Sequence, residues 1–268
     1  MRYIIPLLLF ILTSLTILAQ TPTKKGQFYV YWGWNRGTYT PSDIHFKGDA
    51  YDFTLKSVIA KDRQSAFTFN KYFGLTKFTT PQYNVRIGYF LDDTYNISFG
   101  IDHMKYVVTT NQVTKISGSI NATETIYDGF YNNNNIQLAE DFLTLEYTDG
   151  LNYQNIELRR LDNFINFDKL KISVVEGIGI GTLIPKSNVR LFTNERYDHF
   201  HLSGYGVNGV LGLNIEFFKY FFIQSEIKGG FMHMVRVRTT ISKSDTAHQH
   251  FFFTQANVVF GGIFKIGK

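Results

Sequence analysis

Apolar side chains occupy every second position in several segments of the chain, and this period of two predicts β-strands. In the first such segment, residues 27–36, the apolar face carries Phe28, Val30, Trp32 and Trp34. The same alternation recurs in 83–89, 97–102, 204–217, 223–236 and 255–266. The sequence therefore predicts an all-β protein.

The opposite face of these segments combines glycine and asparagine with charges of both signs. Such a mixture fits the inside of a narrow barrel, where small residues leave room for long ones and opposite charges pair. The outer face is rich in Phe, Tyr, Val and Ile, as lipid contact requires. The alternative is a soluble β-sandwich or lipocalin-like fold, whose exposed polar face would not favour glycine. The charges expected to form a network in the lumen are Arg86, Asp102, Glu157, Arg159, Glu216, Glu226, Lys228 and Arg236.

Connection lengths predict the topology. Three connections are short (92–93, 162–168 and 218–219) and four are long (37–81, 109–149, 184–201 and 239–250). Outer-membrane barrels have short periplasmic turns and long outer loops, so we expect an antiparallel up-and-down transmembrane barrel with both termini in the periplasm. Its eight strands are expected near 27–36, 82–91, 94–108, 150–161, 169–183, 202–217, 220–238 and 251–267. Ten strands is the alternative, because 51–59 also looks extended; we interpret it as strand structure rising from the first outer loop.

Four charged or polar residues depart from the apolar pattern of the lipid face. Simple counting places Arg160 and Glu176 there, together with His103 and Lys105. His103 and Lys105 are expected at the outer rim. We expect Glu176 to mark a bulge at the start of the glycine-rich stretch 177–181.

The N-terminus has the pattern of a secretory signal peptide. A positive start at Arg2 precedes an apolar run from Ile4 to Leu12, and small residues follow up to Ala19. We expect cleavage after Ala19, which leaves 20–268 as a single barrel domain. The apolar run is shorter than a spanning helix needs, which disfavours a retained signal anchor.

Composition narrows the chemistry. The chain has no cysteine, which excludes disulfides, Cys-ligated metals and a thiol nucleophile. Its net charge of +5 fits contact with anionic lipid head groups, including lipopolysaccharide. The sequence shows no phosphate loop, basic helix or zinc module, so we expect no nucleic-acid partner, and nothing in it indicates a cofactor.

Four strings of residues together resemble an outer-membrane β-barrel family of Bacteroidota. They are 28–35 (FYVYWGWN), 42–48 (SDIHFKG), 88–95 (GYFLDDTY) and 100–107 (GIDHMKYV). The resemblance extends over most of the mature chain and implies a barrel in the cell outer membrane. It implies no activity, because the family has no biochemical role to carry over.

A pore is the first function to consider for a barrel. Eight strands enclose an interior that side chains can fill, and the expected lumen is crowded with charges and with Tyr29 and Tyr31. We therefore expect a packed lumen rather than an open channel.

Two His-x-His pairs suggest metal binding: His199 with His201, and His248 with His250. In an extended segment, residues i and i+2 point the same way, so each pair could chelate one ion, with Asp198 or His45 completing the site. The alternative is that these are rim residues without a ligand.

A third hypothesis is a lipid A deacylase-like enzyme. Such barrels carry a His-x-Ser pair and a carboxylate on the lipid-facing wall, which His201, Ser203 and Glu176 could supply as base, nucleophile and orienting acid. Glu176 is only roughly placed for this role.

The long loops carry amides and aromatics, such as Asn132 to Asn135 beside Phe130, which suit binding of sugars, peptides or proteins. The sequence thus favours a non-enzymatic outer-membrane barrel that acts in surface binding, in envelope integrity or as an accessory subunit of an outer-membrane complex. The deacylase-like enzyme and the extracellular metal-binding protein remain the alternatives.

Overall fold

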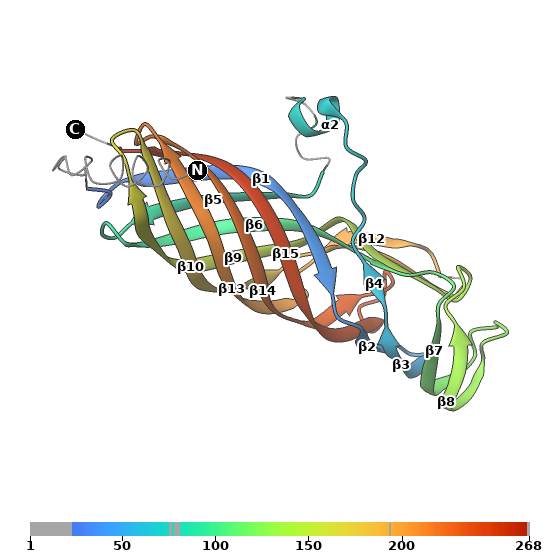
Figure 1. The fold of residues 1–268 in the computed structure, drawn as a ribbon. Coiled ribbons are helices and arrows are strands. Elements are labelled where there is room, and N and C mark those ends of the chain that lie inside the picture. Colours follow the sequence, from blue (N-terminus) through green and yellow to red (C-terminus); the bar gives the residue numbers. More distant parts are fainter. Residues whose placement is uncertain (1–22, 75–76, 78–80, 193, 267–268) are drawn as a thin grey trace, which may run out of the picture.

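The computed structural model describes residues 23–74, 77, 81–192 and 194–266 (Figure 1). The expected cleavage site at Ala19 lies outside these residues. Within them, eight long antiparallel strands follow one another around a ring. They are β1 (Phe28–Tyr39), β5 (Tyr83–Phe90), β6 (Tyr95–Val108), β9 (Leu143–Asn166), β10 (Leu170–Leu183), β13 (Gly204–Phe217), β14 (Phe221–Arg238) and β15 (Thr246–Phe264). The eight-stranded barrel predicted from the sequence is confirmed.

Pairing between the first and last of these strands closes the ring. β1 pairs with β15 along its whole length, from Phe28 opposite Phe264 to Tyr39 opposite Phe253. A closed barrel has no free edge, so its backbone N–H and C=O groups are satisfied by neighbouring strands, as hydrocarbon requires. The outward side chains are apolar and exposed, for example Phe99, Ile156, Ile180 and Leu213. The chain is an outer-membrane β-barrel with a lipid-facing outer wall.

Short turns connect the strands at one end of the barrel, where β1 also begins and β15 ends (Figure 1). In the turn between β5 and β6, the carboxylate of Asp92 accepts the backbone N–H groups of Thr94 and Tyr95 at 2.7 and 2.6 Å. In the turn between β13 and β14, Phe218 and Lys219 have positive φ angles of 53° and 72°, which reverse the chain within three residues. This end matches the predicted periplasmic end.

The long connections at the other end form a β-structured extension of the barrel. The sheet continues from β15 to β2 (Ser42–Lys47), β3 (Tyr51–Val58), β7 (Val113–Ile120) and β8 (Gly129–Gln137). A second hairpin, β11 (Lys186–Leu191) with β12 (Tyr197–Phe200), pairs with β9, while β4 (Ala60–Lys61) pairs with β6. The expected strand at 51–59 is therefore part of this extension, which Figure 1 shows at the end of the barrel opposite the short turns.

Two barrel strands begin well before their predicted first residues. β9 begins at Leu143 rather than 150, and β15 begins at Thr246 rather than 251. Their extra residues pair with strands of the extension, since Leu145 lies opposite Val189 of β11 and Ala247 lies opposite Phe46 of β2. The loops predicted there are wrong, because the barrel strands continue beyond the ring.

One apolar core joins the barrel to the extension. It contains Ile44, Phe53, Phe142, Phe192 and Phe251, each at most 3% exposed. Burial of each such side chain contributes on the order of 2 kcal/mol. The extension is therefore packed as a continuation of the barrel. A smaller core of Tyr29, Tyr31, Phe90 and Phe222 lies toward the short-turn end.

A short helix, α2 (Phe69–Phe73), lies on the outer side of β1. Thr68 caps it by accepting the N–H of Lys71, and the rings of Tyr72 and Phe73 contact Trp34 with centroids 5.5 and 5.0 Å apart. None of the helices within the described residues combines the length and the hydropathy of a membrane-spanning segment.

Candidate functional site

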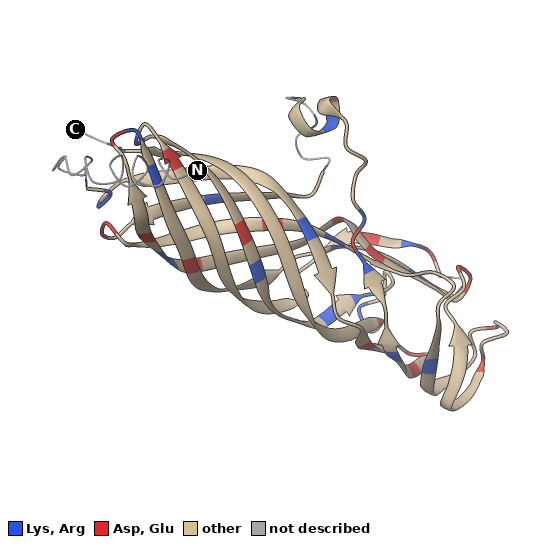
Figure 2. Cartoon of the chain, viewed as in Figure 1, with Lys and Arg blue, Asp and Glu red and all other residues tan. Residues whose placement is uncertain are grey.

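Six buried charges form an ion network across the middle of the lumen, where Figure 2 shows acidic and basic positions side by side on the barrel strands. Glu157 is its centre. Its carboxylate contacts Arg86 at 3.0 Å, Arg159 at 2.6 Å and Lys228 at 2.8 Å. Arg159 also contacts Glu226 at 2.9 Å, and Lys228 contacts Asp102 at 2.6 Å. Three cations thus face three carboxylates.

Neutral side chains satisfy the remaining polar groups of the network. The hydroxyl of Tyr31 accepts from Arg86 Nε at 3.0 Å and from Arg159 Nη2 at 3.1 Å. Asn155 donates to Asp102 at 3.0 Å, and Asn208 donates to Glu157 at 3.0 Å. A buried ion network is tolerated only when its charges balance and its donors find acceptors, and both conditions hold here.

The network fills the cross-section of the barrel. The exposed fractions of Arg86, Glu157 and Lys228 are 1%, 0% and 0%. A small cavity near the short-turn end, lined by Tyr29, Phe90 and Arg159 among others, has a volume of about 20 Å³. That volume is close to what a single water needs. The geometry is that of a packed lumen.

Two of the eight charges predicted for this network lie elsewhere. Glu216 is buried but belongs to a separate pair, 2.7 Å from Lys24, nearer the short-turn end. Arg236 does not face the lumen, so this prediction is wrong. The register shifts between Met234 and Val237, which turns Val237 inward and leaves Arg236 exposed, where its guanidinium donates to the carbonyl of Lys243.

Four histidines gather on the outer wall at the extension end. His248 lies opposite His45 in register, and His250 lies opposite His233. The ring centroids are 6.1 Å apart for His45 and His248, 5.9 Å for His233 and His248, and 6.0 Å for His233 and His250. The structure thus brings together the predicted pair His248 and His250 with the suggested partner His45, and adds His233.

The second predicted histidine pair is separate from this cluster. His199 lies in β12, and His201 comes directly after this strand. The Nε2 atom of His201 accepts the backbone N–H of Arg238 at 3.0 Å. Burial lowers the pKa of His201. Among the described residues, no group of three or more His, Asp or Glu side chains has an arrangement that could hold a metal ion.

The three residues of the deacylase hypothesis do not meet. The backbone N–H of Ser203 donates to the carbonyl of Leu183, so Ser203 lies beside the end of β10. Glu176 lies seven residues earlier on the same strand, which pairs with β13 without interruption. At about 3.3 Å per residue, this separates the serine from the carboxylate by roughly 23 Å. Ser203 is also buried, with an exposed fraction of 2%.

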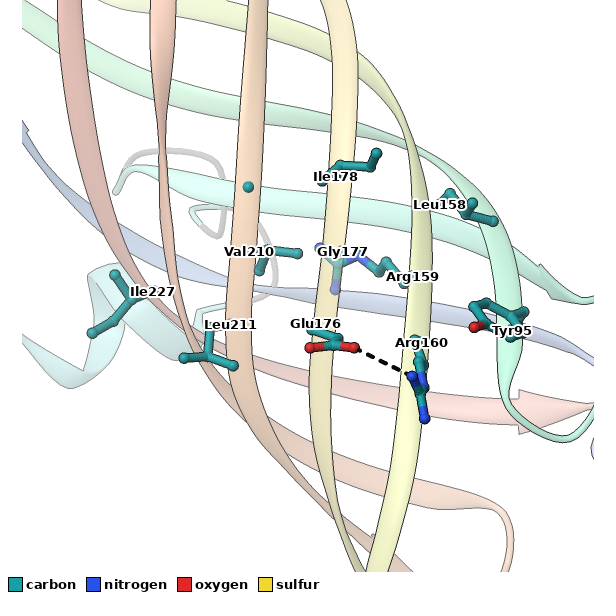
Figure 3. A pocket seen from close by; sticks show the side chains of 11 residues that line it. Tyr95, Leu158, Arg159, Arg160, Glu176, Gly177, Ile178, Val210, Leu211 and Ile227 are labelled. Atoms are coloured by element: carbon teal, nitrogen blue, oxygen red, sulfur yellow. Dashed lines mark ion pairs between the residues drawn. The ribbon is translucent and has the colours of Figure 1, made fainter.

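Glu176 instead lines a groove on the lipid-facing wall (Figure 3). The groove has a volume of about 550 Å³ and lies over the backbone of Gly209. Its walls include Leu158, Ile178, Leu211 and Ile227. At its edge, Arg160 Nη1 lies 3.9 Å from Glu176 Oε1.

The bulge expected at Glu176 is not present. β10 pairs continuously from Val174 to Leu183 with β13, and from Ser173 to Leu183 with β9. The irregularity lies earlier, between Ile172 and Ser173. Glu176 therefore points outward in regular alternation, and its exposed side chain results from the sequence pattern itself.

At the outer rim, the ring of His103 is covered by Tyr83, which stacks on it with centroids 4.8 Å apart.

Sequence reasoning did not single out Lys24, Asn155 and His233. The signal for Asn155 was its place on the polar face of β9, and the signal for His233 was its outward parity with Phe231 and Val235 on β14. Lys24 precedes the first strand, where no periodicity operates.

Comparison with solved structures finds similarity to other outer-membrane barrels. OprG of Pseudomonas aeruginosa is 11% identical with a TM-score of 0.44, over 91% of this chain and 98% of that one. The N-terminal barrel domain of OprF from the same organism is 11% identical with a TM-score of 0.31, over 88% and 98% of the two chains. Ail, the attachment invasion locus protein of Yersinia pestis, is 10% identical with a TM-score of 0.28, over 88% and 99%, in a complex with a heparin analogue. No protein-family model and no curated protein matches the sequence.

Proposed function

We propose that this protein is a non-conducting outer-membrane barrel that presents its β-structured extension as a binding surface outside the cell. The observation that carries the proposal is the filled lumen, in which Glu157 and its three cationic neighbours lie at most 2% exposed. A filled barrel anchors and positions its outer segment but offers solutes no path.

The outer end of the extension has the composition of a contact surface. Phe130 on β8 is 82% exposed, and Ile126, just before this strand, is 87% exposed. Asn132 to Asn135 on the same strand supply exposed amide donors and acceptors. Exposed aromatics beside amides suit sugars, peptides or a protein partner, including a subunit of an outer-membrane complex. The resemblance to a Bacteroidota family remains a prediction.

The surface is tested by affinity recovery from native membranes. We compare the unaltered protein with a variant carrying Ile126→Ser and Phe130→Ser, and use Ile241→Ser as a matched control, because Ile241 is 85% exposed on another loop. We expect the double variant to lose a stoichiometric partner or glycan that the control retains. Equal recovery by all three proteins would contradict the proposed surface.

The closed lumen is tested separately in planar lipid bilayers. We expect the purified barrel to give no discrete conductance steps. Stable steps at low voltage would show an open aqueous path and refute the non-conducting role, whatever the pull-down recovers.

The deacylase-like role is not proposed, because Glu176 lies roughly 23 Å along the wall from the residue that pairs with Ser203. The metal-binding role is also not proposed, since the described residues contain no group of three or more His, Asp or Glu side chains that could hold an ion.

A further inference from the structure

The lipid-facing groove carries charges that the wall itself does not balance. Arg160 donates to Asp162 at 2.9 and 3.1 Å and lies 3.9 Å from Glu176. One cation thus faces two carboxylates, so the cluster carries one net negative charge. Charged side chains on the lipid face of a barrel are costly, and this cost is reduced when a lipid head group places a cation beside the weakly paired carboxylate.

Glu176 is the member with room for a further partner. Arg160 is held by Asp162 on one side, and its guanidinium carbon lies 5.9 Å from the centre of the Tyr95 ring. Among the described residues, Arg160 is the only cation that forms an ion pair with the Glu176 carboxylate, and the side chain of Glu176 is 53% exposed. The carboxylate can therefore accept hydrogen bonds from a cation that approaches along the wall.

The position of the cluster fits a head group near the membrane interface. Tyr95 begins β6 directly after a short turn and lies opposite Arg160 in register. Tyrosine is enriched at the interfaces of membrane barrels. Because the short-turn end is the predicted periplasmic end, this interface belongs to the inner leaflet, which consists of phospholipid.

The groove continues from this cluster over a smooth apolar floor. Gly209 on β13 pairs with Ile178 of β10 on one side and with Gly229 of β14 on the other. This row of outward-facing positions is the next one after the row that contains Glu176 and Leu211. A Cβ at Gly209 would meet only the carbonyl of Gly177, at 3.8 Å, so the space above this glycine is open. In Figure 3, Ile178, Leu211 and Ile227 line the space beside it. An acyl chain fits such a groove.

We propose that this groove binds a zwitterionic aminophospholipid of the phosphatidylethanolamine class, with its ammonium on Glu176, its phosphate on Arg160 and an acyl chain over Gly209. The weakly paired carboxylate of Glu176 decides between occupants. An anionic phospholipid brings a phosphate without the ammonium that Glu176 needs. A second copy of the chain, placed about a twofold axis, sets one negative cluster against another. The inference rests on the outer wall and is independent of the proposed surface-binding role.

The test measures lipid retained by the purified barrel in detergent with EDTA, after equilibration with equimolar phosphatidylethanolamine and phosphatidylglycerol of identical acyl chains. Native mass spectrometry counts each bound lipid. We expect the unaltered protein to retain phosphatidylethanolamine over phosphatidylglycerol by about tenfold, the effect of one hydrogen bond to a charged group.

Two variants separate the head group from the tail. Glu176→Gln keeps the size of an exposed side chain, and we expect it to lose the preference between the two lipids. Gly209→Leu fills the open floor, and we expect it to lose retention of both. Glu195→Gln, which removes an exposed carboxylate from the extension, is the matched control and should behave as the unaltered protein. Equal retention of both lipids by the unaltered protein, or a preference that survives Glu176→Gln, would overturn the proposal.

Discussion

Glu157 is the residue whose removal tests the lumen most directly. Its two carboxylate oxygens contact three cations, Arg86, Arg159 and Lys228, at 2.6 to 3.0 Å, and Asn208 also donates to it. Glu157→Gln keeps the shape of the side chain and removes one negative charge. Three buried cations then face two carboxylates in a space from which bulk water is excluded.

The size of the effect follows from this imbalance. Removing one partner of a buried ion pair costs about 3 to 5 kcal/mol, because a buried charge is left uncompensated. The amide oxygen of glutamine still accepts one hydrogen bond, so we expect the free energy of unfolding to fall by about 3 kcal/mol, the lower end of that range. A second substitution, Lys228→Met, removes one cation and should recover about 1 kcal/mol or more of the loss, as coupled neighbours do.

Urea unfolding of the barrel in lipid vesicles measures these differences, with the gel mobility of the folded form as a second readout. Glu195→Gln serves as the exposed control and should unfold with the unaltered protein. If Glu157→Gln unfolds at the same urea concentration as the unaltered barrel, or if adding Lys228→Met makes it less stable still, the network does not have the balanced role assigned to it.

Four further results are expected. Arg86→Gln should cost about 3 kcal/mol or more in urea unfolding, as a broken buried pair does, whereas Arg236→Gln should change stability by less than about 0.5 kcal/mol because the bulge exposes it; equal losses would contradict the bulge. Gly100→Leu should prevent correct folding, since a Cβ there meets Arg86 at 2.6 to 2.9 Å, while Gly209→Leu should fold normally on the same gel. The hydrogen bond from Thr23 lowers the pKa of Asp93 in the folded protein. The ionised Asp93 therefore stabilises this turn above the unfolded pKa of about 4, and this stabilisation is lost as the pH falls through the lower folded pKa. Hydrogen exchange at residues 23–27 should rise below that folded pKa, and in Asp93→Asn it should be raised already at pH 7. Acyl chains carrying bromine should quench the emission of Trp32 and Trp34, which lie on the outer face of β1, and unquenched emission would argue against a lipid-facing wall.

The barrel itself could be predicted because one physical constraint applies along every spanning strand. Hydrocarbon outside and a polar lumen inside force strict alternation, as in β13, where Val207 and Leu213 face outward while Asn208 and Asn214 are buried. The same alternation is present in β2, where Ile44 and Phe46 are buried while Asp43, His45 and Lys47 are not. The barrel pattern predicts a loop there because it counts only strands that span the membrane, although the apolar alternation continues above the membrane.

Three features of the sites could not be obtained from periodicity. The alternation along β14 predicts that Arg236 faces the lumen. A bulge reverses which face the following residues point to, and the amino-acid composition of the strand does not reveal it. The pair of Lys24 with Glu216 joins residues far apart in the sequence, and the meeting of His45 with His248 depends on how an outer strand pairs. Long-range register is set by the whole sheet, so one segment read alone does not contain it.

The charges of the lumen and those of the outer wall differ in how closely each is paired with an opposite charge. In the lumen, each carboxylate of the network has a cation within 3.0 Å, and the hydroxyl of Tyr31 and the amide of Asn155 take up further donors and acceptors. On the wall, Glu176 has only a distant contact at 3.9 Å, in surroundings where an unmatched charge is costly. A network that satisfies itself stabilises the fold and needs no ligand, whereas an unmatched carboxylate beside an open groove remains available for one. The interactions of this protein with other molecules are therefore to be sought on its outer surfaces, on the membrane side at Glu176 and beyond the membrane at β8.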